Sequence, residues 1–87
     1  ILKEKIDKTF KKTKIFFKKN GLLLNWNEFE KLDQDQKINT LAMIAPISNE
    51  EKQTILESVR IDSKVKVLSE IIEFYLHEKT TTNITLQ

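Results

Sequence analysis

The chain contains only one glycine, Gly21, and one proline, Pro46, in 87 residues. So few turn-forming residues exclude a fold of many short strands joined by tight turns, and they favour helices joined by short loops. Apolar side chains also recur every three or four residues through most of the chain, which is the helical period. We therefore expect an all-α fold, a compact bundle of about five helices with a long C-terminal helix.

Capping residues mark the predicted helix boundaries. The first helix covers about Leu2 to Lys19 and ends at Gly21, which can adopt the left-handed conformation that closes many helices. Each later helix follows a residue whose side chain can accept a hydrogen bond from the first turn, namely Asn25, Asp33, Ser48 and Asp62. Pro46 ends the third helix, because the residue before a proline disfavours helical geometry. The last helix covers about Ser63 to Lys79.

Two apolar stripes indicate the core of the bundle. On the first helix the stripe comprises Leu2, Ile6, Phe10, Thr13 and Phe17, with Phe16 on its flank. On the last helix it comprises Val65, Leu68, Ile71, Ile72, Tyr75 and Leu76, wide enough to face several neighbours. Residues 1–79 should form the bundle. Residues 80–87 lack this pattern and are expected to form an extended or disordered tail.

The charge distribution is uneven. Residues 1–20 hold eight lysines against two acidic residues, a net charge of +6, whereas the remainder holds seven basic and eleven acidic residues, a net charge of −4. The basic first helix could follow the phosphates of a nucleic acid. However, it has no arginine for paired contacts to bases, and the acidic remainder would repel a nucleic acid. Nucleic-acid binding is therefore an alternative, less favoured than a solvated helix face.

The residues needed for catalysis or for ligand chemistry are scarce. His77 is the sole histidine, there is no cysteine, and one glycine cannot build a phosphate-binding loop. Asp33 and Asp35 lack the further oxygen ligands of a calcium loop. We expect no catalytic residue, cofactor or metal, and no membrane span, because no apolar run approaches the roughly 20 residues that a span requires. The absence of cysteine fits a reducing compartment, and we expect a cytoplasmic protein.

A surplus of apolar residues follows the first helix. Leu22, Leu23 and Leu24 cannot all point inward from one short connector, and Trp26 lies directly after them. Ile15 points away from the apolar stripe of the first helix. Exposed apolar patches mark interaction sites, and tryptophan is enriched in them. These five residues are the candidate protein-binding residues.

The segment from Asn39 to Leu68 carries a resemblance. A helix that ends in A-x-x-x-P-I is followed by a helix with K-Q-x-x-L-E, here Ala42, Pro46, Ile47, Lys52, Gln53, Leu56 and Glu57. In these motifs, over about residues 26–78, the chain resembles the C-terminal helical part of the Lon protease substrate-binding (N-terminal) domain. In that family a β-rich subdomain precedes the helices, and it would precede Ile1 here. The family's D-x-x-R-L arrangement differs, because Asp62-Ser63-Lys64-Val65 offers a lysine at a shifted spacing.

The resemblance implies a noncatalytic module that binds unfolded or regulated protein segments, or another protein. The ATPase motif and the Ser–Lys dyad of Lon belong to other domains, so no enzymatic activity is expected of this chain. We interpret the motif residues as structural, fixing the fourth and fifth helices relative to each other. A purely structural bundle is the third hypothesis, and the sequence does not predict an oligomeric state.

Overall fold

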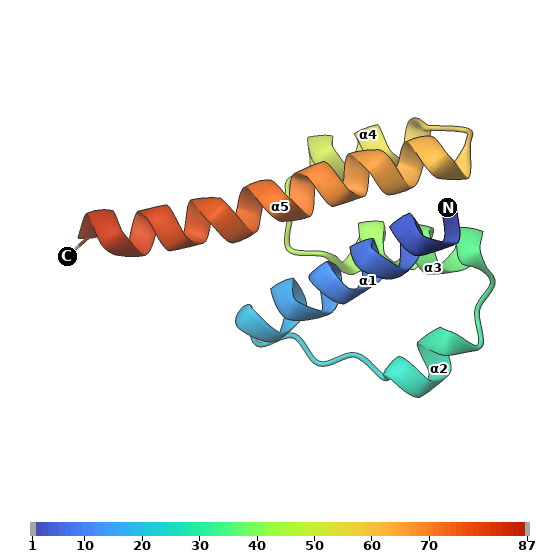
Figure 1. Cartoon of the computed structure of the whole chain (residues 1–87), viewed down its shortest axis with the longest axis horizontal. Coiled ribbons are helices and arrows are strands. Elements are labelled where there is room, and N and C mark those ends of the chain that lie inside the picture. Colours follow the sequence, from blue (N-terminus) through green and yellow to red (C-terminus); the bar gives the residue numbers. More distant parts are fainter. Residues whose placement is uncertain (1, 87) are drawn as a thin grey trace.

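Five helices follow one another along the chain, and no strand occurs within residues 2–86 (Figure 1). The helices are α1 (Leu2–Lys19), α2 (Trp26–Glu30), α3 (Gln34–Ile44), α4 (Asn49–Glu57) and α5 (Ile61–Leu86). This computed structural model describes the backbone of residues 2–86 and the side chains of residues 2–77. The predicted all-α bundle with a long C-terminal helix is confirmed.

Helices α1 and α5 form the main contact of the bundle and run in the same general direction (Figure 1). Helices α3 and α4 pack on each other and on α5. Helix α2 lies to one side, and the C-terminal part of α5 projects beyond the body of the molecule (Figure 1). The N-terminal ends of α1 and α5 therefore lie at one end of the bundle, and the turn after α1 lies toward the other.

The core contains side chains from every helix, and α2 contributes Phe29 to it. The largest fully buried side chains are Ile6, Thr13, Phe16, Phe17, Ile38, Leu41, Ile55, Leu68 and Ile72. Two residues of α1 differ from the predicted stripe. Leu2 is exposed, whereas Phe16, predicted on the flank, is only 1% exposed because α5 covers that side and brings Tyr75 to a ring distance of 5.5 Å.

Most of the predicted helix boundaries are confirmed. Gly21 has a φ of 70°, and the amides of Gly21 and Leu22 donate to the carbonyls of Lys18 and Phe17 at 3.1 and 3.0 Å. These two bonds are the Schellman arrangement that closes a helix. The capping residues Asn25, Asp33 and Ser48 each accept a hydrogen bond from the first turn that follows them. Helix α3 ends at an extended Ala45, directly before the proline.

Both predicted ends of the last helix were wrong. Helix α5 begins at Ile61, so Asp62 lies in its first turn, where its carboxylate accepts from the amide of Ser63. The expected tail at residues 80–87 is instead helical as far as Leu86, and Gln87 lies outside the described residues. No glycine or proline follows Pro46 to stop the helix. Threonines lower helix propensity by only about 0.7 kcal/mol each or less, so they do not terminate it.

None of the helices within residues 2–86 has both the length and the apolar character needed to cross a membrane. The long α5 carries charged side chains along the part that packs against the bundle.

Candidate functional site

A hollow of about 370 Å³ lies beside the turn that ends α1, and we name it the Trp26 hollow. It brings together the last turns of α1 and the extended connector to α2. Its lining residues are Lys14, Phe17, Lys18, Gly21, Leu22, Leu23, Leu24 and Trp26. Four of the five predicted binding residues therefore share one hollow. The fifth, Ile15, is half exposed on α1 and does not line it.

Trp26 is fixed by three contacts with its neighbours. Its ring lies 6.0 Å from that of Phe17 in a tilted arrangement and 5.2 Å from that of Phe29, edge to face. The Nζ of Lys14 lies 5.0 Å from the centre of the indole, within the range of a cation–π contact. These contacts fix the orientation of the indole before any partner binds. The residue is only partly buried, so part of its surface remains accessible to a partner.

The three leucines take different positions, as their sequence predicted. Leu24 packs against the core, Leu22 is partly exposed, and Leu23 is 99% exposed. The Schellman turn sets this pattern, because it reverses the chain after α1 and leaves an extended connector. Successive side chains of an extended segment point to opposite sides, so only some of them can reach the core.

Gly21 forms part of the lining of the hollow, and the space beside it is open. No heavy atom lies within 4 Å of the position that a Cβ would occupy at Gly21. The sequence did not predict Lys14, Phe17, Lys18 and Gly21 as lining residues. The sequence feature that could have identified them is their spacing of three and four residues. This spacing places them on one face of the helix that leads into the leucines.

The hollow is apolar with a basic rim. Lys14 and Lys18 are its charged lining residues, and none of its lining residues is acidic. Both lysines are exposed on α1. Chemically, this arrangement can bury an apolar side chain and attract carboxylates that flank it.

The Lon-like motif residues lie elsewhere, around α3 and α4. Ala42 is fully buried, and the Nζ of Lys52 donates to the carbonyl of Met43 at 2.6 Å. This contact joins α4 to α3, whereas the motif was predicted to fix α4 against α5. Pro46, Gln53, Leu56 and Glu57 are exposed, so they add little to the packing of α4.

Helices α4 and α5 are joined instead through Glu51 and Tyr75. The phenol of Tyr75 donates to Glu51 Oε1 at 2.5 Å, and the same oxygen accepts from the amide of Ser48 at 2.9 Å. Partial desolvation raises the pKa of Glu51, but the bonds from Tyr75 and Ser48 outweigh it and hold that pKa below its ordinary value. The bond to Glu51 raises the pKa of Tyr75. Neither residue lines the Trp26 hollow, so we assign this pair to the architecture of the bundle.

The described side chains offer no metal centre, because no three histidine, aspartate or glutamate residues gather closely enough to hold an ion. His77 is exposed on α5. Comparisons of the chain with protein-family models, with curated proteins and with solved structures give no match. The resemblance to the Lon substrate-binding domain therefore stays a prediction.

Proposed function

We propose that the chain is a noncatalytic protein-binding module that receives an apolar side chain of a partner segment at the Trp26 hollow. The observation that supports this function best is Leu23, a leucine 99% exposed to water beside a half-buried tryptophan. Covering a leucine side chain completely contributes about 1.5–3 kcal/mol. A partner that buries Leu23 therefore gains a large share of a moderate binding free energy.

The hollow is suited to binding because its parts are already in place. Phe17 and Phe29 hold the indole of Trp26, and the Schellman turn holds the backbone of Gly21 and Leu22. A surface that needs little ordering loses less conformational entropy on association. The partner segment should carry apolar side chains flanked by acidic ones, because Lys14 and Lys18 form the rim.

This function agrees with the one expected from the Lon-like motifs, recognition of unfolded or regulated protein segments. We propose that the module acts in the cytoplasm, where such segments would be available and where a chain without cysteine is at no disadvantage.

A synthetic peptide of sequence EELFLEE provides the test, with EESSSEE as the control peptide. Trp26 is the sole tryptophan, so its fluorescence reports events at the hollow directly, and titration calorimetry gives the affinity. We expect Leu23→Ser to weaken binding of EELFLEE about ten-fold or more, from the loss of one buried leucine. Leu23 is so exposed that this substitution should leave the fold intact.

Ile15→Ser is the matched control variant, because Ile15 is an exposed apolar residue of α1 outside the hollow. It should bind the peptide like the original chain. The proposed function is wrong if the unmodified chain does not bind EELFLEE, if it binds EESSSEE equally well, or if the two variants weaken binding to the same degree.

A further inference from the structure

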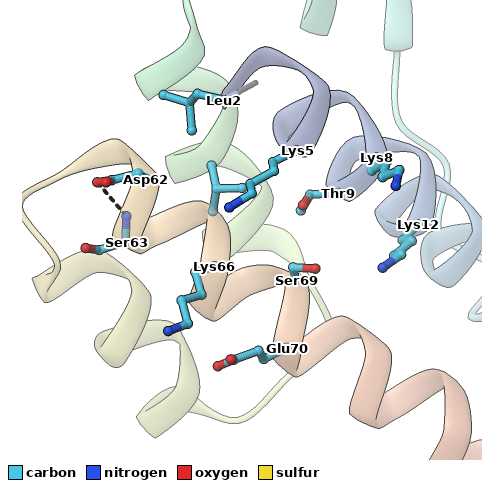
Figure 2. A pocket seen from close by; sticks show the side chains of 11 residues that line it. Leu2, Lys5, Lys8, Thr9, Lys12, Asp62, Ser63, Lys66, Ser69 and Glu70 are labelled. Carbon is cyan, nitrogen blue, oxygen red and sulfur yellow. Dashed lines mark hydrogen bonds between the residues drawn. The ribbon is translucent and has the colours of Figure 1, made fainter.

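A second, larger hollow lies between the N-terminal halves of α1 and α5, away from the Trp26 hollow. It has a volume of about 610 Å³, and we name it the α1–α5 groove (Figure 2). Its lining residues are Leu2, Lys5, Lys8, Thr9, Lys12, Asp62, Ser63, Val65, Lys66, Ser69 and Glu70. Hollows of about 300–1,000 Å³ are the usual size of small-molecule sites.

This groove carries positive charge that has no partner among the described side chains. Lys5 and Lys8 of α1 and Lys66 of α5 are all exposed, and none of them makes a hydrogen bond or an ion pair with another described side chain. Lys12 differs, because its amine is paired with Glu73 just outside the groove. The free amines belong to both walls of the groove. Figure 2 shows the amine of Lys5 directed toward α5, whereas the amines of Lys8 and Lys66 point outward, so these two exposed side chains would rotate inward to contact an anion between the helices.

The acidic residues of the groove do not cancel this charge. Asp62 is already engaged, because it accepts from the guanidinium of Arg60 at 3.2 Å and from the amide of Ser63 at 2.9 Å. Glu70 is the remaining carboxylate of the lining, so three lysines without an ion pair, Lys5, Lys8 and Lys66, outnumber it. The N-terminal ends of α1 and α5 lie at this end of the bundle and add the positive potential of their helix dipoles (Figure 1).

The other lining residues define the class of ligand. Ser63 and Ser69 carry hydroxyl groups that can donate to an anion (Figure 2). Leu2 and Val65 offer apolar surface beside them. Lysine binds phosphate as a point charge, and a serine hydroxyl can donate a hydrogen bond to a phosphate oxygen. We propose that the α1–α5 groove binds a small organic phosphate, with its phosphate between the free lysines and its apolar part against Leu2 and Val65.

A nucleic acid fits this groove less well than a small phosphate. Glu70 follows Lys66 one turn later along α5, and its carboxylate would repel the next phosphate of a long polyanion. The basic residues of α1 are lysines without exception, so they cannot make the forked contacts by which arginine reads bases. The groove therefore favours a ligand with one phosphate group.

Phenyl phosphate is the probe for the test, with inorganic phosphate, phenol and a twelve-base-pair DNA duplex as separate arms. Amide chemical shifts of the full chain are followed by NMR during each titration. We expect phenyl phosphate to shift the amides of Ser63 and Ser69 and to bind more tightly than inorganic phosphate or phenol. DNA should bind more weakly than phenyl phosphate at equal salt.

Two double variants with equal charge changes make the test specific. Lys5→Gln with Lys8→Gln removes two groove amines, whereas Lys3→Gln with Lys11→Gln removes two exposed amines of α1 outside it. The groove variant should weaken phenyl phosphate binding about five-fold, as expected for the loss of two exposed charge contacts, and the control less than about two-fold.

Equal weakening in the two variants would overturn the proposal, as would shifts spread over all lysines or tighter binding of DNA. Leu23→Ser should bind phenyl phosphate normally, so this proposal and the proposed function succeed or fail separately.

Discussion

Tyr75 of α5 donates its phenolic hydrogen to the carboxylate of Glu51, the residue that closes the capping box of α4, over a distance of 2.5 Å. One carboxylate oxygen therefore completes the start of one helix and attaches it to another. The pair is partly buried, which strengthens a hydrogen bond to an ionised group.

Tyr75→Phe should destabilise the fold by about 1.5–3 kcal/mol, the usual contribution of a hydrogen bond to a charged group. The substitution keeps the aromatic ring and its contact with Phe16, so packing changes little. Urea unfolding followed by circular dichroism measures the difference. In a Glu51→Gln background, Tyr75→Phe should cost clearly less, and an equal cost in both backgrounds would show that the pair is not coupled.

Acid should weaken the fold through Glu51. Its folded-state pKa lies below the ordinary value of 4.5, because the bonds from Tyr75 and Ser48 outweigh the desolvation that raises it. The unfolded state then binds the proton more tightly, so the stabilisation is present above the ordinary pKa and is lost as the pH falls through the folded-state pKa. Between about pH 5 and pH 3, the original chain should lose more stability than Glu51→Gln. Urea unfolding at each pH measures the free energy of unfolding of both proteins. If the two free energies fall in parallel as the pH is lowered, Glu51 does not cause the loss of stability.

Gly21→Ala should destabilise the chain by about 1–2 kcal/mol, the cost of a left-handed conformation for a residue with a Cβ. The φ of 70° and the open space around the Cβ position mean that this cost arises from the backbone alone. Gly21→Asn should cost less, because asparagine adopts this conformation more readily. The order glycine, asparagine, alanine in urea midpoints is the expected result, and an alanine variant as stable as the original chain would contradict it.

Lys64 and Asn39 should respond unequally to substitution. Lys64 is only 8% exposed, and its Nζ donates to Asn39 Oδ1 at 3.0 Å. Asn39→Ala leaves a buried ammonium group without this acceptor and should cost about 1–3 kcal/mol. Lys64→Met removes the charge and keeps most of the volume, so thermal unfolding should show a smaller loss. The double variant should resemble Lys64→Met, and a larger cost for Lys64→Met would reverse this interpretation.

The sequence predicted local features of the fold better than distant ones. The caps at Asn25, Asp33 and Ser48 and the left-handed Gly21 depend on hydrogen bonds within about one turn, so their residues stand close together in the chain. The end of α5 was missed because a helix continues without an apolar stripe when no glycine or proline interrupts it.

Features that depend on packing partners were less visible. Phe16 is buried because α5 covers that side of α1 and brings Tyr75 against it. The spacing of apolar residues within α1 does not reveal which side α5 will cover. The leucines of the Trp26 hollow were predicted because they are adjacent. The α1–α5 groove was not predicted, because its two walls are far apart in the sequence and lie side by side only after the chain has folded.

Helix α2 has five residues, too few to be stable in water alone, and it is held to α1 by the rings of Phe29 on Phe10 and of Trp26 on Phe17. Separation of these rings would release α2 while the other four helices stay assembled, a sub-global opening of low free energy. The amides of α2 should then exchange with deuterium sooner than those of α1. The same opening would uncover Phe10 and Phe17. A partner segment with larger apolar side chains than the closed Trp26 hollow can hold could then bind at this place.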